Sequence, residues 1–176
     1  DQLSGSRLVT LIGAGGVGKT RLAIHAAAES ADTFPDGTWL VELAALRDPG
    51  QVGPAIATTL SIPEDPGRSI TDVLVRTLKD RKVLLVLDNC EHLVGEVAQV
   101  VESLLRACPK LSILATSREA LGVPGEVRHR VPSLPASEAT SPAVSLFVDR
   151  ASAVRPDLTW NPAALDAVSQ ICVRLD

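Results

Sequence analysis

The chain has 176 residues, 45% of them hydrophobic, and a net charge of −4 at pH 7, which suits one globular core but gives no basic surface for nucleic acid. No apolar run approaches the roughly 20 residues that a membrane-spanning helix needs, and the first residues show no secretion-signal pattern. The three cysteines, Cys90, Cys108 and Cys172, are odd in number and lack metal-binding spacing, so they indicate reduced thiols in a cytoplasmic protein.

Short apolar segments bounded by turn residues recur along the chain and predict β-strands. The most apolar of them, KVLLVLD at 82–88, is typical of a strand buried on both faces of a parallel sheet. The segment at 126–134 alternates in polarity and favours an edge strand. The predicted strands cover residues 7–12, 36–43, 82–88, 111–117 and 126–134.

Segments rich in helix-forming residues lie between these strands. In SITDVLVRTLKD the apolar residues recur at helical spacing, and either Ser69 or Thr71 is placed to cap the helix. The predicted helices cover residues 19–30, 51–60, 69–80, 91–108, 143–152 and 161–175. This alternation of strands and helices predicts an α/β fold with a mostly parallel sheet and right-handed crossovers.

The loop between the first predicted strand and helix is rich in glycine. Its sequence, GAGGVGKT, matches the phosphate-binding pattern GxxxxGK[ST] and has a strand before it and a helix after it. Glycines let several main-chain N–H groups point at one anion, and the helix N-terminus adds positive potential. Lys19 supplies a charge for the terminal phosphates, and Thr20 supplies a hydroxyl for Mg²⁺. The predicted phosphate-loop residues are Gly13, Ala14, Gly15, Gly16, Val17, Gly18, Lys19, Thr20 and Arg21.

The buried segment at 82–88 ends in Asp88, at the edge where open α/β sheets place ligands. Beside a phosphate loop, this acid matches the Walker B pattern and is predicted to bind Mg²⁺ together with Thr20; taken alone, it would suit a turn or a helix cap. The next residue, Asn89, cannot accept a proton as a base. Glu91 is the candidate base, and the alternative is an acid that only stabilises the first turn of a helix. These residues therefore support nucleotide binding better than fast hydrolysis.

Another buried strand, ILATS, is followed by Arg118. This position suits a cation that reaches the γ-phosphate and senses its presence; the alternative is an ordinary surface arginine. The candidate catalytic residues are thus Lys19, Asp88, Glu91 and Arg118.

Three segments, LVTLIGAGGVGKTRLA, VLLVLDNCEHL and ILATSREALGVPGEVRHRVPSLP, occur in this order. Together they resemble the STAND-class, NB-ARC-like ATPase domain of AfsR-like (SARP) and large LuxR-type bacterial transcriptional regulators. The resemblance implies a P-loop NTPase fold, with helices flanking a five-stranded sheet in the order 5-1-4-3-2. It also implies a switch that binds ATP or ADP with Mg²⁺ and hydrolyses ATP slowly. Its partners would be the DNA-binding and helical-repeat domains of the regulator and copies of itself in a nucleotide-dependent oligomer, without direct binding of nucleic acid or membranes.

The same resemblance, with a Pro-, Ser- and Ala-rich stretch after the last strand, suggests three parts of the chain. They are a P-loop nucleotide-binding subdomain over 1–134, a linker over 135–142 and the start of an ARC1-like helical subdomain over 143–176. Two adenine-contacting motifs of the family, one hhGRE-like and one GLPLA-like, fall outside the two ends of the chain. We therefore expect binding dominated by the phosphates, weaker than in the parent protein and poorly selective for the base.

Three other functions fit parts of the pattern. A small-molecule kinase would carry arginines in a lid over the phosphates, and the segment after Arg118 offers only those in EVRHR. A GTPase would carry an NKxD-type motif that recognises guanine, and the sequence lacks one. A nucleotide-binding interaction module without significant hydrolysis is favoured by Asn89. Single-turnover hydrolysis distinguishes this module from the switch.

Overall fold

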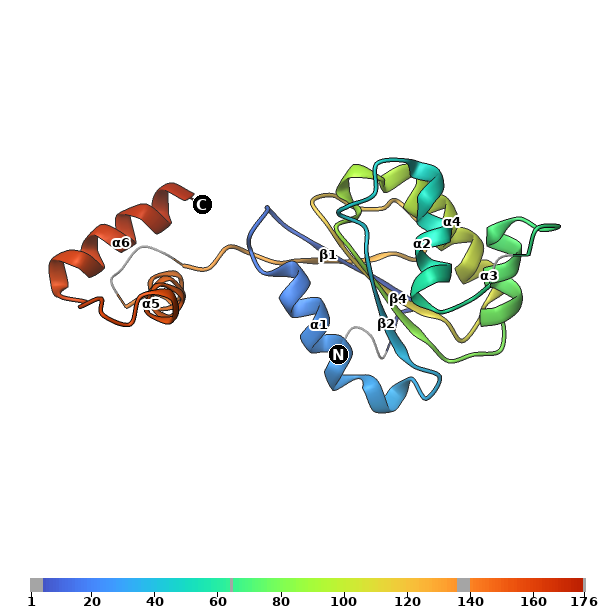
Figure 1. Cartoon of the computed structure of the whole chain (residues 1–176), viewed down its shortest axis with the longest axis horizontal. Coiled ribbons are helices and arrows are strands. Elements are labelled where there is room, and N and C mark those ends of the chain that lie inside the picture. The colour runs from blue at the N-terminus through green and yellow to red at the C-terminus, as the bar shows by residue number, and fades with distance from the viewer. Residues whose placement is uncertain (1–4, 64, 136–139, 176) are drawn as a thin grey trace. The chain divides into compact units, whose positions relative to one another are not determined.

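The computed structural model describes residues 5–63, 65–135 and 140–175 (Figure 1). The chain divides into two compact units, Asp1–Val131 and Pro132–Asp176, and each is described by itself. The predicted linker over 135–142 lies partly outside the described residues, which do not include 136–139.

In the first unit, the described residues form one sheet of five strands. These strands are β1 (Leu8–Ile12), β2 (Thr38–Glu42), β3 (Leu84–Asp88), β4 (Ser112–Ser117) and β5 (Val127–Arg130). Their order is β2-β3-β4-β1-β5, and every neighbouring pair is parallel. The predicted α/β class and the order 5-1-4-3-2 are confirmed, with β4 between the strand that precedes the glycine loop and the strand that ends in Asp88.

Helices cover both faces of this sheet. In the described part of the first unit they are α1 (Lys19–Glu29), α2 (Val52–Thr59), α3 (Ile70–Leu78) and α4 (Val94–Ala107). A smaller core cluster joins one face to α1, and a larger cluster joins the other face to α2, α3 and α4. The N-cap of α3 is Ser69, whose Oγ accepts a hydrogen bond from the N–H of Asp72.

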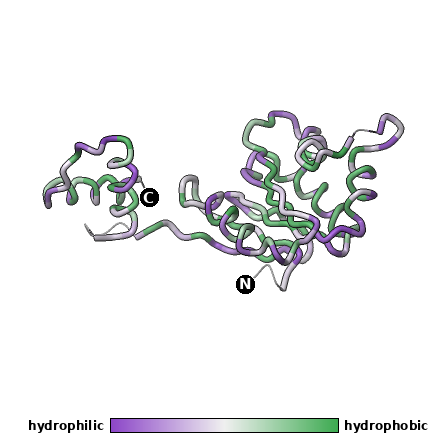
Figure 2. The backbone as a smooth tube through the Cα atoms, turned by 60° about the horizontal axis from the view of Figure 1, so that its bottom comes forward, coloured by the Kyte–Doolittle hydropathy of each residue, from purple (hydrophilic) through white to green (hydrophobic). Residues whose placement is uncertain are grey.

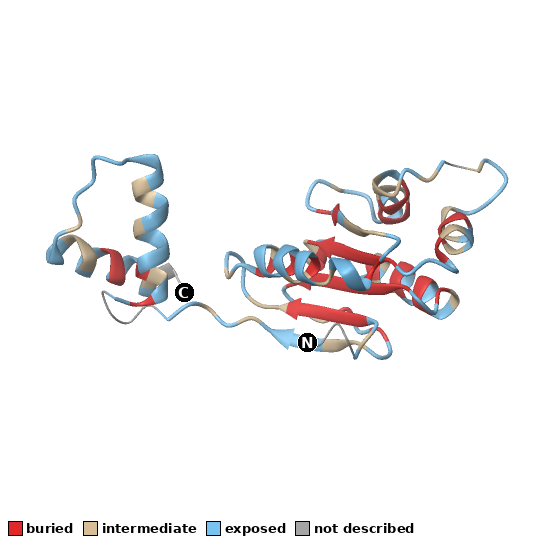
Figure 3. Ribbon diagram, turned by 90° about the horizontal axis from the view of Figure 1, so that it is seen from below, coloured by how far each residue is buried: buried red, intermediate tan, exposed pale blue. Residues whose placement is uncertain are grey.

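The central strands are buried because both of their faces are covered, as Figure 3 shows for the strands beneath the helices. In β3, Leu85 and Leu87 pack in the larger cluster, whereas Leu84 and Val86 pack in the smaller one. Figure 2 shows the corresponding hydrophobic segments along the central strands. Successive side chains of a strand point to opposite faces, so Asp88 lies on the same face as Leu84 and Val86, the face that α1 covers.

Two predicted boundaries differ from the structure by three residues or more, and the others by two residues at most. The predicted helix over 91–108 begins only at Val94, because Cys90–His92 form a short 3-10 turn after Asn89, whose backbone is left-handed with a φ of 61°. The predicted strand over 126–134 ends at Arg130. Pro132, two residues further on, has no N–H to donate to a neighbouring strand.

The second unit contains two helices among its described residues, α5 (Pro142–Val154) and α6 (Pro162–Leu175). The rings of Phe147 and Trp160 meet edge to face, with their centroids 6.4 Å apart. Trp160 Nε1 also donates a hydrogen bond to Ser152 Oγ at 2.9 Å. Across the described ranges of both units, none of the helices has the length and the apolar character needed to span a membrane.

A buried carboxylate orders the connection between β4 and β5. The Glu126 side chain is 1% exposed, and it accepts hydrogen bonds from the N–H groups of Leu121 and Gly122 at 2.8 and 3.1 Å and from Arg128 Nε at 3.1 Å. Burial alone would raise the pKa of Glu126, but hydrogen bonds to its charged form outweigh burial and lower the pKa below the ordinary value of 4.5.

Replacing Glu126 by glutamine is expected to lower the free energy of unfolding by roughly 1 kcal/mol at neutral pH, because the buried N–H of Leu121 and the more exposed donors of Gly122 and Arg128 lose a charged acceptor. Since the folded-state pKa is lowered, the stabilisation by the wild-type carboxylate is present above pH 4.5 and is lost as the pH falls below it. Urea unfolding at neutral pH and near pH 3 measures both effects. Glu119→Gln is the control, because Glu119 is exposed in the same connection; equal losses in the two variants would contradict the prediction.

Candidate functional site

The glycine loop joins the end of β1 to the start of α1, at the edge where the parallel strands end. Gly18 is the N-cap of α1 and has a φ of 90°, a left-handed conformation that favours glycine. A Cβ atom on Gly13 would lie 2.6 Å from the carbonyl oxygen of Val131, so the close approach of the backbone there requires glycine. The loop therefore brings the N–H groups at the N-terminus of α1 to the edge of the sheet, where they attract an anion.

Lys19, the first residue of α1, turns back over this loop. It is only 8% exposed, and its Nζ donates hydrogen bonds to the carbonyl oxygens of Gly13 and Ala14 at 3.0 and 2.9 Å. The ammonium group thus places a positive charge against the loop. A phosphate there would offer this group a charged acceptor, which makes a stronger hydrogen bond than a carbonyl does.

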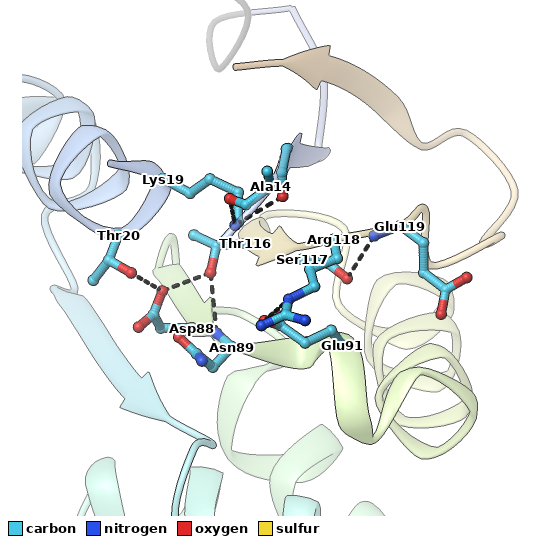
Figure 4. Close-up of polar contacts among 11 residues, drawn as sticks. Ala14, Lys19, Thr20, Asp88, Asn89, Glu91, Thr116, Ser117, Arg118 and Glu119 are labelled. Atoms are coloured by element: carbon cyan, nitrogen blue, oxygen red, sulfur yellow. Dashed lines mark hydrogen bonds and ion pairs between the residues drawn. The ribbon is translucent and has the colours of Figure 1, made fainter. Parts of the chain in front are cut away.

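Thr20 and Asp88 meet between α1 and the end of β3 (Figure 4). Thr20 Oγ1 donates a hydrogen bond to Asp88 Oδ1 at 2.7 Å, and Asp88 is only 6% exposed. A hydroxyl and a carboxylate are hard oxygen ligands of the kind that Mg²⁺ binds beside phosphate oxygens and water, so the pair fits a magnesium ion. The described residues hold no group of three or more Cys, His, Asp or Glu side chains arranged for a metal.

Glu91 and Arg118, predicted separately as the base and the γ-phosphate sensor, form an ion pair. Arg118 Nε lies 3.2 Å from Glu91 Oε1, with 67% of the Arg118 side chain and 18% of the Glu91 side chain exposed. The guanidinium also reaches the glycine loop, because a Cβ atom on Gly15 would lie 3.4 Å from Arg118 Nη2. Glu91 Oε2 is buried and has no hydrogen-bond partner in the part of the chain that the structure describes. Its acceptor capacity is therefore unused in this arrangement, and water can reach it only if the ion pair with Arg118 opens.

These side chains surround a cavity of about 400 Å³. It is lined by Gly15, Gly16, Gly18, Lys19, Thr20, Arg21, Asn89, Glu91 and Arg118. Asp88 is not among the lining residues and meets the cavity through its bond to Thr20. A second hollow of about 360 Å³ follows α1 and shares two of its four lining residues with the first. It is lined by Gly18, Arg21, Leu22 and His25.

Most of the predicted site residues thus come together from three segments that are far apart in the sequence. Among the predicted phosphate-loop residues, three do not line the cavity: Gly13, Ala14 and Val17. Gly13 and Ala14 instead supply the carbonyl oxygens that hold Lys19.

Sequence reasoning did not assign two side chains that lie beside Asp88. Thr116 Oγ1 donates a hydrogen bond to Asp88 Oδ1 at 2.5 Å, whereas its segment predicted only a buried strand. Glu42 is the register partner of Asp88 in the parallel pair of β2 and β3. Register partners of paired strands point to the same face, so a second, exposed carboxylate lies beside Asp88. An acid at the end of the apolar segment TWLVE is the only sequence signal for Glu42.

Cys90 also lies next to the site. Burial first, and the negative charges of Asp88 and Glu91 second, raise the pKa of its thiol to about 12. Cys90 therefore stays neutral near pH 7 and packs as an apolar side chain, with its Sγ donating to the carbonyl oxygen of Leu87 at 3.3 Å. All three cysteines are free thiols, as the sequence predicted.

The strand order, the glycine loop between β1 and α1 and the acid at the end of β3 define the class of P-loop NTPases. The model of the NB-ARC domain family matches residues 1–138. The chain belongs to the NB-ARC domain family, in agreement with the resemblance carried by its three motifs.

Known proteins place this domain within longer chains. A Mycobacterium tuberculosis protein named provisionally as an HTH-type transcriptional regulator is 50% identical over 174 residues, which are 99% of this chain and 19% of that protein. The regulatory protein AfsR of Streptomyces griseus is 34% identical over 132 residues, 65% of this chain and 13% of AfsR. The chain thus spans about a fifth or less of these two relatives.

Among solved structures, a STAND ATPase with a tetratricopeptide repeat sensor from Pyrococcus horikoshii is similar, with a TM-score of 0.52 and 18% identity. The match covers 97% of this chain and 26% of that chain. At this identity the match shows the fold alone. The likeness to large LuxR-type regulators stays a prediction.

Proposed function

We propose that the chain is the ATP/ADP-binding switch module of a bacterial transcriptional regulator and that it binds Mg-ATP with slow hydrolysis. The observation that carries the proposal is the bond between Thr20 and Asp88 directly beside the glycine loop and the Lys19 ammonium. Membership of the NB-ARC family and the names of the two longer relatives support the regulatory setting. The proposed partners are the DNA-binding and helical-repeat domains of the regulator and further copies of the chain.

Each part of the cavity has its own task in this proposal. The N–H groups of the loop and of the first turn of α1 hold phosphate oxygens, and Lys19 exchanges two carbonyl acceptors for the terminal phosphates. Thr20 and Asp88 hold Mg²⁺, which when bound neutralises part of the phosphate charge. The hollow along α1 beside Arg21 gives room for the nucleoside, and a wall built from one helix agrees with poor selectivity for the base.

The ion pair of Glu91 and Arg118 gives the site a means to distinguish ATP from ADP. A γ-phosphate carries more negative charge than one carboxylate, so it competes with Glu91 for the guanidinium. Arg118 has the freedom to move, because most of its side chain is exposed. Once Arg118 leaves, Glu91 can orient or deprotonate a water molecule. ADP lacks the γ-phosphate, so the pair stays closed.

Slow hydrolysis follows from the acids that are available. Asn89 directly follows Asp88, the proposed Mg²⁺ ligand, and cannot act as a base. Glu91 is held in an ion pair by Arg118. The same two observations favour a second candidate function, a nucleotide-binding interaction module without significant turnover. Glu42, the register partner of Asp88, is the alternative candidate for the carboxylate that acts on water, although it does not line the cavity.

Calorimetric titration with ADP and with a non-hydrolysable ATP analogue, both with Mg²⁺, tests binding. We expect both nucleotides to bind. We also expect Glu91→Gln to tighten binding of the ATP analogue relative to ADP by a few-fold, on the order of 1 kcal/mol or less for a partly exposed pair, because glutamine no longer competes for Arg118. Glu119→Gln, an exposed change nearby in the sequence, should leave the ratio unchanged. A wild-type chain that binds neither nucleotide contradicts the proposal.

Single-turnover hydrolysis of ATP distinguishes the switch from the non-hydrolysing module. Phosphate release by the wild type above the Lys19→Ala background supports the switch, and release at the background level supports the module. If the wild type hydrolyses ATP, Glu91→Gln and Glu42→Gln then show which carboxylate acts on water. Loss of turnover only in Glu42→Gln would overturn the role assigned to Glu91.

A further inference from the structure

Thr116, at the end of β4, makes two hydrogen bonds with the segment that follows β3. It is 1% exposed. Its Oγ1 lies 2.5 Å from Asp88 Oδ1 and 3.0 Å from the main-chain nitrogen of Asn89 (Figure 4). The backbone register between β3 and β4 runs from Leu84↔Ser112 to Leu87↔Ala115. Thr116 and Asp88 each lie one residue beyond the last register pair of the two strands. The Thr116 side chain therefore joins the strands at Asp88, where the paired backbone ends.

The directions of these hydrogen bonds are determined by chemistry. A main-chain N–H can only donate, so the Asn89 N–H donates to a lone pair of Thr116 Oγ1. The single hydroxyl proton of Thr116 is then directed to Asp88 Oδ1. Thr20 donates to the same oxygen. Both hydroxyls thus bond Oδ1, and in the described residues neither of them bonds Oδ2, which leaves that oxygen for the water shell of a metal ion.

The same threonine holds the backbone that forms a wall of the cavity. Asn89 lines the cavity and has a φ of 61°, a left-handed conformation that asparagine tolerates better than most residues other than glycine. Its N–H would lack this partner if Thr116 had no hydroxyl. Thr116 itself does not line the cavity, so it acts on the site through its neighbours.

We infer that Thr116 is a positioning residue, whose hydroxyl orients the Asp88 carboxylate for Mg²⁺ and holds the turn at Asn89. This inference rests on the proposed function, because it assigns a metal to Asp88. Groups that orient a metal-binding carboxylate typically change metal affinity by about tenfold to a hundredfold when they are removed. The phosphate cradle at Gly13–Thr20 lies on another segment, so binding of the nucleotide without metal should change much less than binding with Mg²⁺.

The test is titration of ADP in the presence of Mg²⁺ and, separately, of EDTA. For the wild type, Mg²⁺ should tighten ADP binding. Thr116→Val keeps the shape of the side chain and removes the hydroxyl, and it should reduce this tightening by roughly tenfold while affinity in EDTA changes much less. Thr116→Ser restores the hydroxyl and should restore most of the tightening. Thr10→Val is the matched control, because Thr10 is a buried threonine on the adjacent strand β1.

The outcomes separate this inference from the proposed function. An unchanged Mg²⁺ effect in Thr116→Val overturns the positioning role, and so does an equal loss with Mg²⁺ and with EDTA, which a general structural defect would give. If thermal unfolding shows that Thr116→Val is not folded, Thr116→Ala takes its place and is compared with Thr116→Ser in the same way. A wild type that binds ADP without any effect of Mg²⁺, or does not bind it, overturns the proposed metal site itself.

Discussion

Replacing Lys19 by alanine is expected to weaken binding of Mg-ATP by roughly tenfold to a hundredfold. Lys19 carries the positive charge that the structure places against the glycine loop. A hydrogen bond to a charged group contributes about 1.5–3 kcal/mol, and each 1.4 kcal/mol changes an affinity by about tenfold. Binding of ADP should weaken less, because the ammonium is assigned to the terminal phosphates. Calorimetric titration of the wild type and of Lys19→Ala with each nucleotide measures these changes in affinity.

The control for this prediction is Lys79→Ala. Lys79 is an exposed lysine at the end of α3, outside the cavity, and its removal changes the net charge by the same amount. Because Lys19 also bonds two carbonyl oxygens of the loop, thermal unfolding should accompany the titrations and show that the variant is folded. A folded Lys19→Ala chain with wild-type affinity for Mg-ATP would disprove the assignment of the phosphate loop.

Replacing Leu85 by alanine is expected to lower the free energy of unfolding by about 2–5 kcal/mol. Leu85 is fully buried on β3 and packs in the larger core cluster, which joins the sheet to three helices. Truncation removes apolar contacts and leaves a cavity that the surrounding side chains fill only in part. Domains of this size are stable by about 5–15 kcal/mol, so this one change removes a large share of the total. Urea unfolding at constant pH measures the difference.

Leu40→Ala on the neighbouring strand is the matched control for Leu85→Ala. Leu40 is paired in register with Val86 but is 37% exposed, because β2 lies at the edge of the sheet. Its truncation should cost well under half as much as that of Leu85, since it loses fewer buried contacts. Similar losses in the two variants would show that β3 does not lie in the covered centre of the sheet.

The parts of the site with strong local signals were predictable from the sequence. The spacing of Gly13, Gly18, Lys19 and Thr20 defines a loop and a helix N-terminus within a few residues, and the structure places them in that arrangement. The continuous apolar run before Asp88 likewise indicated a strand buried on both faces. Such patterns are informative because the conformation of a short segment depends mostly on its own residues and on their periodic burial.

Predictions failed where a segment depends on its neighbours. The start of the helix after Asp88 was set three residues too early, since the left-handed backbone at Asn89 and the 3-10 turn after it are stabilised by contact with β4. Glu91 was considered as a base or as a helix-turn acid, but its ion pair with Arg118 had no signal in either segment. The roles of these residues in binding and hydrolysis stay predictions until the titrations are made.

By itself, the sequence determined the alternation of strands and helices, the glycine loop with Lys19 and Thr20, and the acid that ends a buried strand. Only the tertiary structure decided which side chains surround that acid, namely Thr116 from 28 residues away and Glu42 across the β2–β3 pair. The physical reason is that local spacing controls local backbone conformation, whereas contacts between distant residues depend on strand register and on helix packing. No single segment encodes that register, because it results from burial of the whole sheet between its two layers of helices.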